Sequence, residues 1–193
     1  KFAKLGATAK RSDNQAVSKS FEREIPKAGT CFLRLIGYVE LGRHLPNNPT
    51  YKPALKTILT FEMSTPKHLI INDKGEKIPR KFKLSLNKGA TAKSGYKKVF
   101  NMMNKALGGG HEHFFEMFGL PLMGTVYHNT KNKDTPEEVT YANLDDDGAF
   151  SFKAATMEDP ITEAITEVAI PEVHYEMQGL YVGLLGKCLP NST

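Results

Sequence analysis

Apolar and polar residues alternate in three segments of the first half of the chain. The segments 30–41, 55–63 and 80–88 each place apolar side chains at every second position, and Gly37 marks an expected bend or bulge in the first. Turn-forming residues at 72–77 precede the third segment. Because a period of two buries one face of a strand, the pattern predicts three long strands.

The alternation also assigns the side chains of these strands to two faces. The face predicted to point into the core comprises Cys31, Leu33, Leu35, Val39, Leu41, Leu55, Thr57, Leu59, Phe61, Met63, Phe82, Leu84 and Leu86. The face predicted to point outward comprises Phe32, Arg34, Ile36, Tyr38, Glu40, Lys56, Ile58, Thr60, Glu62, Lys81, Lys83, Ser85 and Asn87. We therefore expect cations and aromatic rings together on the outer side of the sheet.

The period changes to that of a helix after the third strand. Between residues 91 and 107 the apolar side chains recur at helical spacing, and the glycines at 108–110 would end the helix. A short helical turn is expected at 113–118. The alternating segments 122–129 and 139–144 then predict two further strands.

The predicted order is three strands, one helix and two strands. This is the element order of the OB-fold, a five-stranded Greek-key barrel that presents strands two and three to oligonucleotides and oligosaccharides. We therefore predict a mainly β fold with a helix between strands 3 and 4. The barrel is expected to span 28–155, after a basic, flexible arm at 1–27 and before an acidic and apolar extension at 156–193.

Charge divides the chain into two halves of opposite sign. Residues 1–105 carry 22 Lys and Arg against 7 Asp and Glu, a formal +15, whereas residues 106–193 carry 4 against 14, a formal −10. The basic residues fall within the predicted strands, so charge is expected on a folded surface. This asymmetry favours nucleic acid or another anionic partner.

The outward face and the strand ends supply a candidate surface for single-stranded nucleic acid, which needs cations for phosphates and rings for base stacking. The candidate residues are Phe32, Arg34, Tyr38, Arg43, Tyr51, Lys56, Arg80, Lys81, Lys83 and Lys88. An alternative interpretation stays open for the rings, because Phe32 and Tyr38 could pack beneath the N-terminal arm or the C-terminal segment. The lysines could form a solvated face, but the basic stripe taken as a set favours binding.

Several motifs together resemble the OB-fold single-stranded DNA-binding proteins of tailed bacteriophages. They are AGTCFLRLIGYVELG, KTILTFEM, IPRKFKLSLN, AKSGYKKVFNMMN, GTVYHNTKN and TYANL, which cover a little over half of the chain. The resemblance implies sequence-tolerant binding of single-stranded DNA during phage replication or recombination, in the cytoplasm of the host cell. It also implies replication proteins, such as a polymerase or helicase, as partners of an acidic region.

The acidic region of this chain lies upstream of its end, whereas many proteins of that class end in an acidic tail. Asp159 and Pro160 are typical of a helix start, and a narrow apolar stripe predicts a helix to about Ala169. We hypothesise that 159–176 occupies part of the binding groove when DNA is absent, although a helix docked on the barrel is an equal alternative. The apolar stretch 179–185 could pack on the barrel, form an additional strand or bind another protomer.

Two other classes of function are considered. A metal-dependent nuclease could use the carboxylates of Asp145 to Asp147, with Glu62, but Gly148 favours a turn there. The His and Glu residues of 111–116 do not have the spacing of a zinc-binding helix. A basic protein-interaction module is the third class. We expect a non-enzymatic protein without metal, cofactor or membrane partner, and with Cys31 as a buried thiol.

Overall fold

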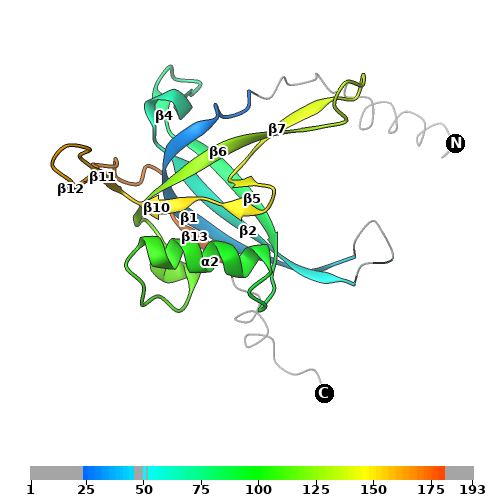
Figure 1. Cartoon of the computed structure of the whole chain (residues 1–193). Coiled ribbons are helices and arrows are strands. Elements are labelled where there is room, and N and C mark those ends of the chain that lie inside the picture. Colours follow the sequence, from blue (N-terminus) through cyan, green and yellow to red (C-terminus); the bar gives the residue numbers. More distant parts are fainter. Residues whose placement is uncertain (1–23, 46–49, 51, 181–193) are drawn as a thin grey trace, which may run out of the picture.

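The computed structural model describes residues 24–45, 50 and 52–180, and their fold is mainly β (Figure 1). Five antiparallel strands form a curled sheet that closes around part of a barrel, and one α-helix crosses the end of it. This part of the expected fold is confirmed.

The main sheet has the strand order β10, β6, β1, β2, β5. Its strands are β1 (Gly29–His44), β2 (Ala54–Met63), β5 (Arg80–Asn87), β6 (Pro121–Lys131) and β10 (Phe152–Ala154). The three predicted strands are therefore consecutive neighbours, and the fourth long strand returns to lie beside the first. β1 is shared along its length, because its first half pairs with β6 and most of its second half with β2.

Two more strands extend this sheet. β7 (Val139–Asn143) pairs with the outer part of β6 as the predicted fifth strand. β13 (Gln178–Leu180) runs parallel to β1 and pairs with residues 37–39. The apolar stretch that begins at Gly179 thus contributes to an additional strand, one of the three possibilities considered for it.

The remaining strands form three small hairpins. They are β3 (Ile70–Ile71) with β4 (Lys77–Ile78), β8 (Asp145–Asp146) with β9 (Ala149–Phe150), and β11 (Thr156–Glu158) with β12 (Ile165–Glu167). The first contains the predicted turn at 72–77, where the Asn72 side chain accepts hydrogen bonds from the backbone N–H groups of Lys74 and Glu76.

The predicted helix is α2 (Gly95–Ala106), and it lies between β5 and β6 as expected. The Ser94 hydroxyl accepts a hydrogen bond from the Lys97 backbone N–H and so caps its first turn. Its buried face carries Val99, Phe100 and Met103, which close one end of the core. The expected turn is the 3₁₀ helix η2 (Phe114–Met117), and a second short one, η1 (Pro66–His68), follows β2.

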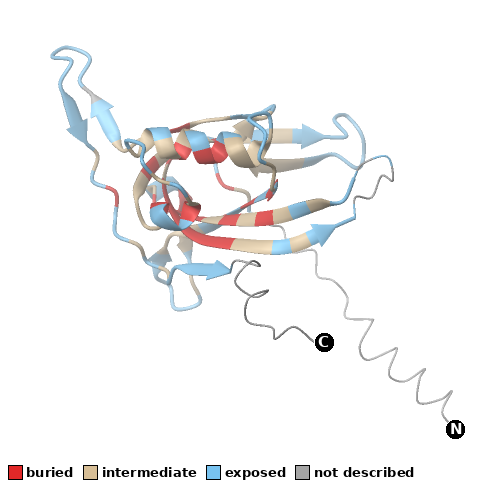
Figure 2. Ribbon diagram, turned by 90° about the horizontal axis from the view of Figure 1, so that it is seen from below, coloured by how far each residue is buried: buried red, intermediate tan, exposed pale blue. Residues whose placement is uncertain are grey.

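The core lies between the curled sheet, α2 and η2, as the buried residues in Figure 2 show. It contains the predicted inward residues of 31–35, 59–63 and 82–86. The alternation fails after Leu35, where the pairing with β2 shifts by one residue before Gly37. Such a bulge exchanges the two faces of a strand, so Tyr38 points into the core and Val39 points outward.

The two leucines predicted at the far end of this core are also placed differently. Leu41 and Leu55 are 44% and 40% exposed, because β1 and β2 continue past the barrel as a hairpin. The alternating pattern continues there without a core beneath it.

The helix expected at 159–169 is wrong. This segment instead contains the turn and second strand of the β11–β12 hairpin. The Asp159 carboxylate accepts hydrogen bonds from the backbone N–H groups of Ile161 and Thr162, as it would at a helix start, but it closes a turn here. Glu163 then adopts a φ of 54°, which ends any right-handed turn, and the following β-branched residues favour a strand.

Candidate nucleic-acid interface

The outer side of β5 carries two of the predicted site cations at exposed positions. Lys81 and Lys83 are exposed and alternate with the buried Phe82 and Leu84, as expected. Lys56 on the neighbouring strand β2 is half-buried and shares this side of the sheet, where it pairs with Asn87. We call Lys81 and Lys83 the basic ridge.

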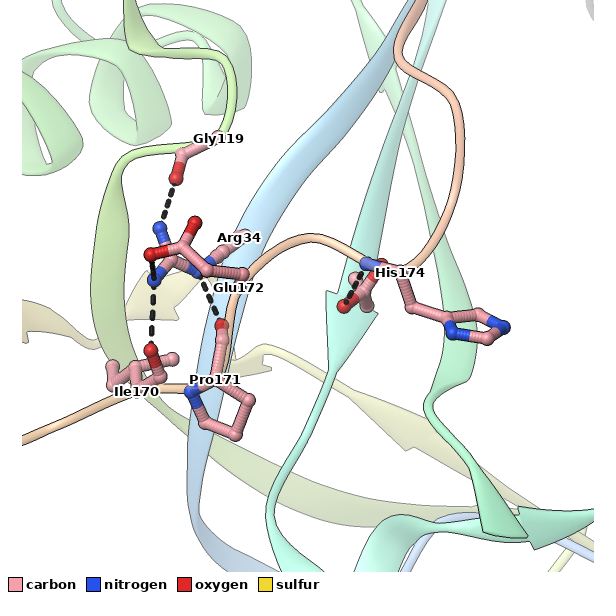
Figure 3. A network of polar contacts seen from close by, with 7 residues as sticks. Arg34, Gly119, Ile170, Pro171, Glu172 and His174 are labelled. Carbon is pink, nitrogen blue, oxygen red and sulfur yellow. Dashed lines mark hydrogen bonds and ion pairs between the residues drawn. The ribbon is translucent and has the colours of Figure 1, made fainter. Parts of the chain in front are cut away.

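Arg34 faces outward as predicted, but it is not free to bind a phosphate. Only 7% of its surface is exposed. Its guanidinium donates hydrogen bonds to the backbone oxygens of Ile170 and Pro171, at 2.8 Å each, and to that of Gly119 (Figure 3). The Oε1 atom of Glu172 lies 3.8 Å from the Nη2 atom of Arg34. Arg34 therefore fastens the C-terminal segment to β1.

Glu62 fastens the same segment a few residues later. Its buried carboxylate accepts hydrogen bonds from the backbone N–H groups of His174 and Tyr175, at 3.0 to 3.1 Å. Together with β13, these contacts hold residues 170–180 across the outer side of β1 and β2. We call residues 170–180 the strap. Part of the surface predicted to bind nucleic acid is thus covered by the chain itself.

The prediction that Tyr38 is a surface ring is wrong. The residue is fully buried, and its ring stacks on Phe114 with centroids 5.8 Å apart. Its hydroxyl donates to the Glu40 carboxylate at 2.6 Å and lies 3.0 Å from the Tyr96 hydroxyl. Burial, followed by these hydrogen bonds, raises the pKa of Tyr38 well above its usual value. The ring is thus packed, but in the core rather than beneath the N-terminal arm or the C-terminal segment, as the alternative interpretation had it.

Two other predicted cations already have protein partners. Lys88 forms an ion pair with Glu40. Arg80 forms an ion pair of 3.3 Å with Glu24 and donates a hydrogen bond to its backbone oxygen. Arg80 thus holds the described end of the N-terminal arm, together with His128, which bonds to the Pro26 oxygen at 2.7 Å.

The last three predicted residues lie away from the basic ridge or outside the described chain. Phe32 is half-buried on β1, beside β6. Arg43 is exposed on the hairpin beyond the barrel, where it pairs with Leu55 and so lies on the face opposite to Lys56. Tyr51 lies outside the described residues.

The basic ridge separates two hollows in the surface. One, of about 370 Å³, has a floor of β1 and β2 residues and is lined by Ile36, Gly37, Val39, Ile58, Thr60, Lys81, Lys83, Glu176 and Gln178. The other, of about 350 Å³, lies between β5 and β7 and is lined by Glu24, Ile25, Pro26, Arg80, Lys81, Phe82, Lys83, Tyr141 and Ala142. Both lysines therefore border both hollows.

Two half-buried tyrosines adjoin the ridge, and neither was predicted as a site residue. The Lys81 ammonium lies 3.9 Å from the centroid of the Tyr175 ring, whose hydroxyl donates to the Pro79 oxygen at 2.7 Å. Tyr141 lines the second hollow, and Lys131 lies 5.4 Å from the centroid of its ring. Both tyrosines stand in segments where apolar and polar residues alternate, VTYANL and VHYEM, and this alternation is the signal that could have indicated them.

The features considered for metal chemistry have structural roles in the described residues. The Asp145 carboxylate accepts the Gly148 N–H at 2.9 Å in the turn of the β8–β9 hairpin, as the turn interpretation predicted. His111 bonds to Asn104, and His113 caps η2. Within 24–45, 50 and 52–180, no group of three or more His, Cys, Asp or Glu is arranged to hold a metal ion.

Cys31 is buried in the core, as predicted, and its Sγ lies 3.4 Å from the Gly124 oxygen. Burial raises the pKa of its thiol to about 12, which keeps it protonated and unreactive. Among the described helices, none is long and apolar enough to cross a membrane.

Comparisons with known proteins add no relative. No protein-family model, curated protein or solved structure matches this chain significantly.

Proposed function

We propose that this protein binds single-stranded DNA without strong sequence preference and without turnover. The observation that supports this best is the basic ridge, where two exposed ammonium groups stand between two hollows and beside two tyrosine rings. Phosphates bind the ammonium groups, and bases enter the hollows or stack on the rings. Lysine supplies charge without the planar fork that reads base edges, which favours binding to any sequence.

The fold supports the same proposal. The spatial order β6, β1, β2, β5 is that of a Greek key in which the fourth strand returns beside the first. We assign the barrel to the OB-fold, with β7 as its fifth strand and the ridge on its third. In that fold the second and third strands present the nucleic-acid surface. The phage context and the replication partners implied by the sequence motifs belong to this proposal.

A titration of labelled oligonucleotides tests the ridge directly. Lys81→Ala combined with Lys83→Ala should weaken binding of single-stranded DNA. Each phosphate contact on a single strand contributes about 0.7 to the slope of log affinity against log salt, so the slope should decrease by about 1.4. Lys93→Ala with Lys105→Ala removes the same charge from exposed positions at or beside α2 and is the matched control.

The control variant should keep most of the slope of the parent protein. Equal losses in both variants would mean that only net charge matters and would contradict a site at the ridge. Duplex DNA and added Mg²⁺ complete the experiment. Cleavage that depends on Mg²⁺ would overturn the proposal in favour of a nuclease, and binding of duplex and single strands with equal affinity would contradict the role of stacking.

A further inference from the structure

Two hairpins project from opposite ends of the barrel (Figure 1, Figure 2). One is the β11–β12 hairpin, residues 156–167, which we call the acidic hairpin. The other is formed by the ends of β1 and β2 beyond the barrel, residues 41–45 and 52–56, which we call the basic hairpin. The two differ in sign of charge, and both expose apolar side chains.

The acidic hairpin leaves its larger apolar side chains exposed in the part of the chain that the structure describes. Met157, Ile161 and Ile165 are 61%, 90% and 73% exposed. Residues 156–169 contain four carboxylates and neither Lys nor Arg. Scattered apolar residues on a surface are ordinary, but three on one short projecting hairpin indicate a contact surface.

The basic hairpin has the complementary composition. Leu41, Leu45 and Leu55 are 44%, 82% and 40% exposed. Arg43 and Lys52 are also exposed, and residues 41–56 contain neither Asp nor Glu. The pairing of Arg43 with Leu55 places a cation and an apolar side chain side by side on one face.

We infer that the acidic hairpin of one copy binds the basic hairpin of a second copy. Leucines then cover isoleucines, and the carboxylates of Glu163 and Glu167 face Arg43 and Lys52. Complementary charge selects this partner and disfavours contacts between two acidic or two basic hairpins. The two surfaces differ and lie at opposite ends, so the contact is head-to-tail and leaves a free surface at each end of a pair.

The interface itself does not depend on the proposed function, but its consequence for DNA does. Copies bound to one strand are held at high effective concentration, which makes a weak contact between neighbours effective. Under the proposed function, head-to-tail contact would therefore produce cooperative binding along a strand.

Charge reversal on each hairpin tests the interface. One variant carries Glu163→Lys with Glu167→Lys, and the other carries Arg43→Glu with Lys52→Glu. None of these residues belongs to the ridge. In sedimentation at low salt without DNA, the parent protein should associate with rising concentration, and each variant alone should associate at least about tenfold more weakly. Circular dichroism checks that both variants are folded.

An equal mixture of the two variants is the decisive sample. In the mixture the two unchanged hairpins can pair with each other, and so can the two reversed hairpins, so association should return to that of the parent. A parent protein that stays monomeric at high concentration, or a mixture that associates no better than its components, would overturn the inference.

The DNA experiment separates this inference from the proposed function. On an oligonucleotide that holds one copy, the affinity of each variant gives the direct effect of its changed charge. On a long strand, each variant alone should bind less cooperatively than the mixture. Equal cooperativity of the variants and their mixture would overturn the interface. Failure of the parent to bind the short oligonucleotide would overturn the proposed function, whereas the sedimentation result would still decide the interface.

Discussion

The burial of each cation determines what it can bind. Arg34 and Lys83 both face outward from the sheet, yet Arg34 is 7% exposed and surrounded by backbone oxygens, whereas Lys83 is exposed. A guanidinium has five donors in a rigid fork, which suits a junction of several carbonyl groups. Lys83 is exposed on the ridge and so is placed to bind a phosphate of a nucleic acid instead.

This difference predicts the effect of losing the guanidinium. Arg34→Met should lower the free energy of unfolding by about 2 to 4 kcal/mol, because it leaves buried carbonyl groups of the strap and of Gly119 without a donor. Arg43→Met removes an exposed guanidinium from the basic hairpin and should change stability by less than about 0.5 kcal/mol. Denaturant titration of both variants measures the difference. Equal effects would show that the strap contributes little to stability.

At the scale of elements, periodicity predicted the long strands, α2 and most of the core, because each buries a continuous face. The sequence could not show where the pattern changes face: the shift before Gly37 depends on pairing with β2. The helix expected after Asp159 failed for a related reason, since its cap serves a turn equally well. A C-terminal segment over the groove was one of the hypotheses, but its anchors, Arg34 and Glu62, could not be predicted because they lie more than 100 residues away from it in sequence.

The strap also places the ring of Tyr175 beside Lys81 of the ridge, and this contact predicts a role for the strap in binding DNA. Tyr175→Leu should reduce affinity for single-stranded DNA by about 1 to 3 kcal/mol, the range measured for one stacked base, without changing the salt slope. A ring releases no counterion when it binds a base. Tyr127→Leu replaces another half-buried tyrosine that lines neither hollow and is the matched control. A changed slope in Tyr175→Leu would mean that the ring acts only by positioning Lys81.

At the scale of the whole molecule, the two halves of opposite charge are interleaved rather than separate. The basic half forms β1, β2 and β5, and the acidic half supplies the strap that crosses two of these strands. The described end of the N-terminal arm begins at Glu24, which contacts Arg80 of β5. Two histidines then hold it: His128 bonds to the Pro26 oxygen at 2.7 Å, and His68 bonds to the Lys27 oxygen at 2.8 Å. Stability of the fold should therefore respond to the protonation of buried groups.

His68 and His113 determine the direction of that response. Burial lowers the pKa of both, most strongly through loss of water around the charged form. The His68 Nδ1 has no hydrogen-bond partner among the described residues, and the His113 Nδ1 accepts a hydrogen bond from the Phe115 N–H. A second proton on either ring would therefore be unfavourable. An unfolded histidine binds a proton near pH 6.5, at higher pH than these folded ones.

The unfolded state therefore binds more protons than the folded state as pH falls below about 6.5, and stability must fall with it. The stability that the two neutral histidines contribute is fully present above about pH 6.5. It is lost as the pH falls through the lowered pKa values of His68 and His113 in the folded state. Unfolding of the parent protein by denaturant should show this loss between pH 7 and pH 5. His68→Gln keeps a donor for the Lys27 oxygen but does not titrate, so its stability should depend less steeply on pH. An unchanged dependence in that variant would show that His68 is not among the groups that link folding to pH.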